Sequence, residues 1–360
     1  MSARNLLANM LGYHLIPCLL ASAVIYLVLW LIFTVARFRR PAGRVLFLYA
    51  GLLKAALVLW AGESVSCLAS HPKAFGYFFF RLPNLLPDGP PFDPRQLPAG
   101  LASSELLGSV LLVILILLLA LLCYRWSRIA PVYRGVYRSR RAEASEFPEV
   151  FEAFDRLVTH AYGRRSWLRR PTLMLIRDAR CPAFTMGIRS PIIVLSVDLV
   201  DKLGTRELTG ILAHELAHVR RLDYLGRWLA TMLRDIMIWN PFVLHWYSQL
   251  EEEQEKASDE YAARLLDDPL AVASGLVEVG AYSRGLPVAS VGPLAAWRTR
   301  KSLRGLNERV GRLAEGVLDP SGRHKRPAFL LYPLLILFLA VESHVAVSLP
   351  RLYAVLSGIQ

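Results

Sequence analysis

Cysteine is scarce in this chain, which narrows the kinds of site that it can carry. Only four cysteines occur among 360 residues, and Cys18, Cys67, Cys123 and Cys181 match no metal-binding spacing. Three of them lie in or beside long apolar segments, so all four are interpreted as small apolar side chains rather than as disulfide partners. Internal repeats are also absent, and the one biased stretch is a Pro-rich loop.

Acidic residues are outnumbered by basic ones, 29 to 42, and the formal net charge is +13. The lysines and arginines gather at the ends of apolar segments and form no groove-sized stripe, so nucleic-acid binding is not expected. Hydrophobic residues make up 54% of the chain, and the mean hydropathy of +0.36 is high for a soluble enzyme of this length. Membrane segments are therefore expected.

Four apolar segments approach the roughly 20 residues that a helix needs to cross a bilayer core. They are expected at about 12–36, 45–70, 105–124 and 327–349. The first segment is too long for a cleaved signal peptide and is followed by Arg37, Arg39 and Arg40, so it is interpreted as a retained anchor.

Basic clusters follow the first and third apolar segments and precede the fourth, which places these ends in the cytoplasm by the positive-inside rule. The predicted organisation is a membrane region, 1–124, with a Pro-rich outer loop at 71–104, and a cytoplasmic domain, 125–326. A fourth span with a short outer tail, 327–360, follows. Both termini are then outside the bacterial cytoplasmic (inner) membrane.

The most informative segment is HELAH, His214 to His218. Residues four apart are neighbours on a helix surface, so the two imidazoles can bind one tetrahedral metal ion. Glu215 lies beside them and can hold a water on that metal and accept its proton. Gly204-Thr205 offers a helix start, and apolar residues between Leu208 and Val219 supply a buried face. The alternative is two ordinary histidines on a core or surface helix.

A catalytic zinc site usually takes a third protein ligand, and the acidic run from Glu251 to Glu260 is the obvious source. In a helix Glu255 and Asp259 share a face, so one could bind the metal while the other orients a ligand imidazole. Glu251 and Glu252 lie on nearly the same face as Glu255. Periodicity alone therefore leaves the choice among these acids open.

A family resemblance covers about Arg125 to Asp319. It is carried by HELAHVRRLD (His214 to Asp223), the Trp-rich segment ending in Asn240-Pro241, and EKASD (Glu255 to Asp259). These segments resemble the BlaR/MecR-type membrane metallopeptidases, which are bacterial antibiotic-response regulators. They are more distantly similar to the HtpX and CAAX prenyl protease group, which shares HExxH followed by ExxxD.

The resemblance implies a role for each matching residue. The ligands of one zinc ion would be His214, His218 and Glu255. Glu215 would be the general base, and Asp259 would orient a ligand imidazole by contacting the side of the ring that faces away from the metal. Asp223 matches a further acidic position of the motif, whose role the sequence does not reveal.

Peptide hydrolysis also needs a donor or cation for the tetrahedral oxyanion. The segment Leu303 to Leu313 resembles an Arg-Val element of the family, which implies this catalytic role for Arg309. Leu303 stands where the prenyl protease group has a histidine. The alternative for Arg309 is a solvated helix face, and His245 and Tyr261 are further candidates for the donor.

Two segments flank the motif. Upstream, 172–176 and 191–196 are apolar, β-branched runs that predict a small sheet. The resemblance implies an edge strand beside the metal that an extended substrate would join, supplied by Ala183-Phe184 or by Ile192 to Leu195. The alternative is a purely structural hairpin. Downstream, 224–250 predicts a helical pair that lies in the membrane surface or in a protein core, and partial membrane contact is favoured.

Together these features predict a mainly α integral membrane protein with four transmembrane helices and a cytoplasmic α+β zincin-like metallopeptidase domain. The implied function is that of a zinc-dependent endopeptidase acting in regulated proteolysis or signalling. Its partners would be the lipid bilayer and a protein substrate, such as a transcriptional repressor or a membrane protein. The alternatives are an HtpX-like quality-control protease, a non-catalytic signalling protein with a structural zinc site, and a transporter.

Overall fold

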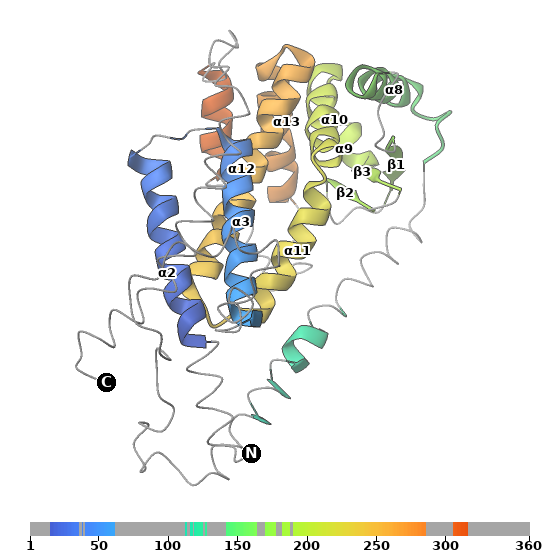
Figure 1. The fold of residues 1–360 in the computed structure, drawn as a ribbon. Coiled ribbons are helices and arrows are strands. Elements are labelled where there is room, and N and C mark those ends of the chain that lie inside the picture. Colours follow the sequence, from blue (N-terminus) through green and yellow to red (C-terminus); the bar gives the residue numbers. More distant parts are fainter. Residues whose placement is uncertain are drawn as a thin grey trace, which may run out of the picture. The chain divides into compact units, whose positions relative to one another are not determined.

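The structure is a computed structural model, and its elements are shown in Figure 1. It describes residues 15–35, 38, 40–61, short stretches between 112 and 127, 142–163, 170–177, 182–187, 190–285 and 305–315. The described part is mostly helical with one small sheet, which confirms a mainly α chain with an α+β part. The chain divides into two compact units, and each is described by itself.

The first unit combines the N-terminal helices with residues 230–250. Its elements are α2 (Ile16–Trp30), the π-helical turn η2 (Leu31–Val35), α3 (Pro41–Ala61), the end of α11 (Asp223–Ile236) and the start of α12 (Pro241–Leu266). Apolar side chains of α2 and α3 pack against Ala230, Met237, Val243 and Trp246 in one buried cluster. The predicted helical pair therefore groups with the predicted membrane helices.

Asn240-Pro241 starts α12 inside this unit. Asn240 is fully buried, and its side-chain oxygen accepts the backbone N–H of Phe242 at 3.1 Å, as a helix N-cap does. Its amide donates to the hydroxyl of Ser22 at 2.9 Å. Pro241 occupies the first helical position, where its fixed φ suits a helix start. The pair thus caps α12 and ties it to α2.

The four predicted spans are borne out only in part. Among the described residues one helix, Pro41–Leu59, is long and apolar enough to cross a membrane, and a shorter apolar helix covers Ala21–Val35. The second span was predicted at 45–70, whereas its helix already begins at Pro41. The span at 105–124 is described only in short stretches, and 327–360 lies outside the described residues.

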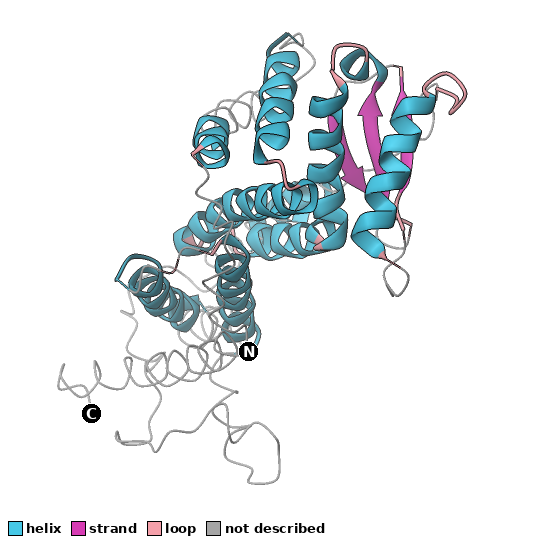
Figure 2. Cartoon of the chain, turned by 90° about the horizontal axis from the view of Figure 1, so that it is seen from above, coloured by secondary structure: helices cyan, strands magenta, loops and turns pink. Residues whose placement is uncertain are grey.

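The second unit contains the sheet (Figure 2). Its strands are β1 (Thr172–Ile176), β2 (Ala183–Met186) and β3 (Ile192–Ser196), in the order β1-β3-β2. β1 is parallel to β3 and β2 is antiparallel to it. Every residue of β3 is buried, as expected for a central strand. The two predicted strands are confirmed, and β2 is an edge strand.

The helices of this unit are α8 (Pro148–Tyr162), α9 (Val197–Val200), α10 (Thr205–Arg220) and α13 (Pro269–Gly285), together with most of α12 and a helix at 305–314. Gly204 caps α10, as the sequence predicted. α10 and α13 pack with almost no space between them. A Cβ added at Gly210 would lie 2.1 Å from the carbonyl oxygen of Ala271, and one added at Gly275 would lie 2.8 Å from that of Glu207. Glycine therefore permits the contact that fixes α10.

Candidate metal centre

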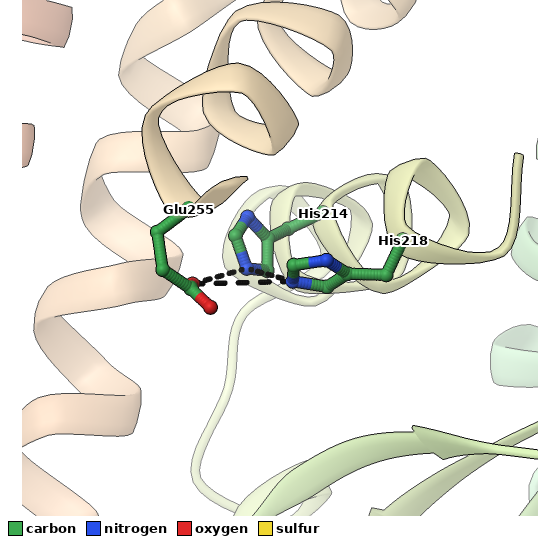
Figure 3. A group of neighbouring side chains, drawn as sticks. All are labelled: His214, His218 and Glu255. Atoms are coloured by element: carbon green, nitrogen blue, oxygen red, sulfur yellow. Dashed lines mark hydrogen bonds and ion pairs between the residues drawn. The ribbon is translucent and has the colours of Figure 1, made fainter. Parts of the chain in front are cut away.

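Two histidines of α10 and one glutamate of α12 point toward one another (Figure 3). Nε2 of His214 lies 3.2 Å from Nε2 of His218. Oε2 of Glu255 lies 3.5 Å from the first nitrogen and 3.9 Å from the second. His214 is buried and the other two side chains are mostly so. Of the six acids between 251 and 260, the structure brings Glu255 to both imidazoles.

These distances suit a zinc ion. Two donors at about 2.0 to 2.1 Å from a tetrahedral zinc are about 3.3 to 3.4 Å apart, close to the three separations between His214, His218 and Glu255. If each imidazole donates its Nδ1–H to a carboxylate, both Nε2 lone pairs face each other at 3.2 Å and need a cation between them, either a proton or a metal ion. The donor set therefore fits a bound metal.

Each imidazole has its own carboxylate at Nδ1. Nδ1 of His214 lies 3.0 Å from Oδ1 of Asp259, although the contact is not well aligned for a hydrogen bond. Nδ1 of His218 lies 3.0 Å from Oδ2 of Asp223, and that oxygen also accepts the hydroxyl of Ser258 at 3.1 Å. A carboxylate behind a ligand imidazole fixes the tautomer and raises its basicity. Asp223, whose role the sequence left open, thus lies behind the second imidazole.

These carboxylates set the charge of the metal-free centre. Burial opposes a charge on His214, but Asp259 and Glu255 outweigh it and raise the pKa of that imidazole to about 9. Burial also disfavours the Glu255 carboxylate, yet Arg309 and the neighbouring imidazoles hold its pKa well below the ordinary value. The pKa of Asp259 is lowered as well, because Arg309 outweighs the cost of burial. A proton therefore occupies the imidazole when no metal does.

Arg309 comes from the helix at 305–314 and is held by two carboxylates. Its Nε and Nη2 donate to the oxygens of Asp259 at 2.6 and 2.7 Å, and its Nη1 lies 3.2 Å from Oε2 of Glu255. Its side chain is only 12% exposed, so the alternative of a solvated helix face is wrong. Arg309 lines the cavity, but its three guanidinium nitrogens contact Asp259 and Glu255. The predicted oxyanion role stays a prediction.

The second guanidinium at the site has no sequence signal of its own. Arg227, on α11, donates from Nη2 to Oε1 of Glu255 at 3.0 Å, and its Nε reaches Oε1 of Gln254 at 3.4 Å. The ligand carboxylate thus receives one arginine on each oxygen. Sequence reasoning missed this contact because Arg227 and Glu255 lie on different helices, 28 positions apart.

Glu215 sits between the metal ligands and the edge of the sheet. The hydroxyl of Thr185, on β2, donates to Oε2 of Glu215 at 2.8 Å. β2 lies at an edge of the described sheet and lines the cavity, so of the two predicted segments Ala183-Phe184 is the one at an edge beside the centre, and its pairing with a substrate stays a prediction. Ile192 to Leu195 is wrong as an edge, because β3 is paired on both sides.

A cavity of about 410 Å³ opens onto these groups. Its polar wall carries the ligands, Glu215 and both arginines, whereas α10 and α13 supply an apolar wall with Ile211, Val272 and Leu276. Tyr261 does not line it, and His245 belongs to the first unit, so neither faces the cavity. The site therefore combines a metal-binding face with an apolar face large enough for a side chain.

Sequence comparisons point to known peptidases. A family model described as BlaR1 peptidase M56 matches residues 96–269. A "Protease HtpX homolog" of Salinibacter ruber is 27% identical over 182 residues, which cover 42% of this chain and 64% of that protein. One of Gemmatimonas aurantiaca is 24% identical over 243 residues, covering 56% and 83%. A third, of Desulforapulum autotrophicum, is 33% identical over 107 residues, covering 29% and 33%.

An HExxH helix with a later ExxxD carboxylate pair, beside an edge strand, is the arrangement expected of a metallopeptidase site. These similarities support the resemblance to BlaR1- and HtpX-type membrane metallopeptidases that the motifs indicated. The matched part spans slightly less than two thirds of the first of these relatives.

Proposed function

We propose that this chain is a membrane-embedded, zinc-dependent endopeptidase that hydrolyses peptide bonds of a cytoplasmic or membrane-proximal protein. The observation that supports this most directly is the placement of Glu215 in one cavity with three donors whose separations suit a single zinc ion. When bound, zinc supplies a Lewis acid that polarises a carbonyl and lowers the pKa of a bound water.

Residues around the cavity would transfer the proton, bind the substrate and orient the metal ligands. The Glu215 carboxylate accepts a proton from the attacking water and passes it to the leaving amine. Thr185 fixes that carboxylate through the 2.8 Å hydrogen bond. The outer edge of β2, with which no other described strand pairs, offers backbone N–H and C=O groups to an extended substrate, which would pair with it as an added strand. Asp223 and Asp259 hold the imidazoles in the tautomer that leaves Nε2 for the metal.

The setting we propose is the bacterial inner membrane, with the metal centre in the cytoplasm and both termini outside. A regulated target, such as a transcriptional repressor or a membrane protein, fits the resemblance to BlaR1. The similarity to HtpX homologs favours a second candidate, quality control of membrane proteins. Broad cleavage of unfolded membrane proteins would support the second candidate, and cleavage of one target would support the first.

The test compares cells that carry the intact protein with cells that carry Glu215→Gln, by mass spectrometry of newly formed peptide termini. Glu215→Gln keeps the metal ligands and removes the base, so metal content is expected to stay at one per chain while the new termini disappear. Glu252→Gln is the matched control, because Glu252 is an exposed acid of α12 outside the cavity. Identical termini with Glu215→Gln would contradict a protease, and bound zinc without any cleavage would favour a structural zinc site.

A further inference from the structure

The two oxygens of Glu255 have different surroundings. Oε2 faces both imidazoles, at 3.5 and 3.9 Å from their Nε2 atoms. Oε1 instead accepts an N–H from Nη2 of Arg227 at 3.0 Å. We propose that Arg227 is a positioning residue that occupies Oε1, so that Glu255 offers a single oxygen to the metal. This inference rests on the proposed function, since it concerns how a zinc centre is kept open for chemistry.

The number of oxygens that Glu255 offers decides whether water can bind. A catalytic zinc takes three protein ligands and keeps its fourth position for water. If both oxygens of Glu255 were to bind together with the two imidazoles, four protein atoms would surround the metal. A charge-assisted hydrogen bond is about twice as strong as a neutral one, so Arg227 favours the carboxylate orientation in which Oε2 faces the imidazoles and Oε1 faces the guanidinium.

The fold fixes Arg227 in this place. Arg227 lies four residues after Asp223 on α11, so both side chains leave the same helix face. Asp223 orients His218 at 3.0 Å, and Arg227 holds Glu255. A second contact, from Nε to the side-chain oxygen of fully buried Gln254 at 3.4 Å, aligns the guanidinium along α12. One face of α11 therefore positions two of the three predicted metal ligands, His218 and Glu255.

Arg309 does not duplicate this role. It contacts Oε2, the oxygen that faces the imidazoles, and otherwise binds Asp259. Removing Arg227 would therefore release Oε1 alone, whereas removing Arg309 would disturb Glu255 and Asp259 together. The side chain of Arg227 is 35% exposed at the cavity wall, whereas that of Arg309 is 12% exposed. Removing Arg227 should therefore cost less stability than removing Arg309.

The experiment uses the full-length protein in detergent, loaded with Co²⁺ as a spectroscopic probe for zinc. Arg227→Gln is expected to keep one metal per chain and to shift the visible cobalt spectrum from a four-coordinate to a higher-coordinate form. The kcat on a cleaved target should fall about 10- to 100-fold, with KM within about threefold. Arg227→Lys keeps a cationic donor for Oε1 and should keep a four-coordinate spectrum. Arg312→Gln is the control, because Arg312 pairs with Glu260 on α12 outside the cavity.

An unchanged cobalt spectrum in Arg227→Gln would overturn the proposal, as would the same shift in Arg312→Gln. If Arg227→Gln binds no metal, the cobalt spectrum of Arg227→Lys tests the proposal instead. A four-coordinate spectrum in the lysine variant supports a positioning role, and loss of metal there too would show a purely structural role and overturn it. A wild-type protein that binds metal without cleaving any target would contradict the proposed function, while the spectra would still decide the role of Arg227.

Discussion

Substitution of Asp259 by asparagine tests how the carboxylates around the metal ligands contribute to stability and to zinc binding. Asp259 is 3% exposed, receives Arg309 through two hydrogen bonds of 2.6 and 2.7 Å, and stands 3.0 Å from Nδ1 of His214. The neutral amide would leave the buried guanidinium with Glu255 as its acidic partner at the site. Removing one member of a buried ion pair costs about 3 to 5 kcal/mol. Losing the carboxylate behind His214 should also weaken zinc binding about 10- to 100-fold.

Two measurements separate these effects. The free energy of unfolding is measured on the metal-free protein in detergent by denaturant titration, and zinc affinity is measured by competition with a chelator. Asp268→Asn is the control for stability, because Asp268 forms a similar two-bond pair with Arg206 at the surface. It is expected to change the free energy of unfolding little, since exposed pairs are screened by solvent.

The double variant Asp259→Asn/Arg309→Gln would refute the reasoning most directly. Removing the guanidinium as well takes away the buried charge that has lost its two-bond partner, so the double variant should be more stable than Asp259→Asn alone. Zinc affinity should stay low, because His214 still lacks its carboxylate. If the double variant is no more stable, or if Asp259→Asn is as stable as Asp268→Asn, the buried charge is not the cause of the loss.

Two further predictions follow from the packing and the charge of the centre. Gly210→Ala should destabilise the protein by about 1 to 3 kcal/mol and weaken zinc binding, because the new methyl would lie 2.1 Å from the carbonyl oxygen of Ala271 and displace α10. Gly311→Ala is the control, because the space around Gly311 is open. Equal losses of stability for the two variants in denaturant titrations would contradict the clash. Zinc binding at pH 7.5 should release close to one proton from His214, whose pKa is about 9 without metal, so affinity should rise about tenfold per pH unit and level off above pH 9. Calorimetry in buffers of different ionisation enthalpy measures this release, and an affinity independent of pH between 7 and 8.5 would exclude it.

The local parts of the site could be predicted from the sequence. The spacing of His214 and His218 places both on one turn of a helix, and Glu255 and Asp259 repeat that spacing on another. The start of α10 and the strands β1 and β3 followed from capping and composition. Such features depend on neighbours within a few residues, where the 3.6-residue helix period and the alternation of a strand fix which side chains share a face.

The choice among equivalent residues needed the folded chain. Periodicity could not prefer Glu255 over Glu251 or Glu252, since these acids lie on similar faces of α12. The motif gave Asp223 no role, and only the structure shows that it begins α11 next to Nδ1 of His218. The alternative of an exposed Arg309 failed because its helix packs on α12, 50 positions away in sequence.

Local patterns in the sequence were therefore enough to predict the family resemblance, the helical ligand pairs and the apolar segments. Tertiary structure alone decided that α11 brings Arg227 to Glu255, that β2 rather than β3 borders the cavity, and that residues 230–250 pack with the N-terminal helices. The physical reason is distance along the chain. Contacts between elements tens of residues apart depend on how whole helices and strands bury their apolar faces, and no short pattern records that arrangement.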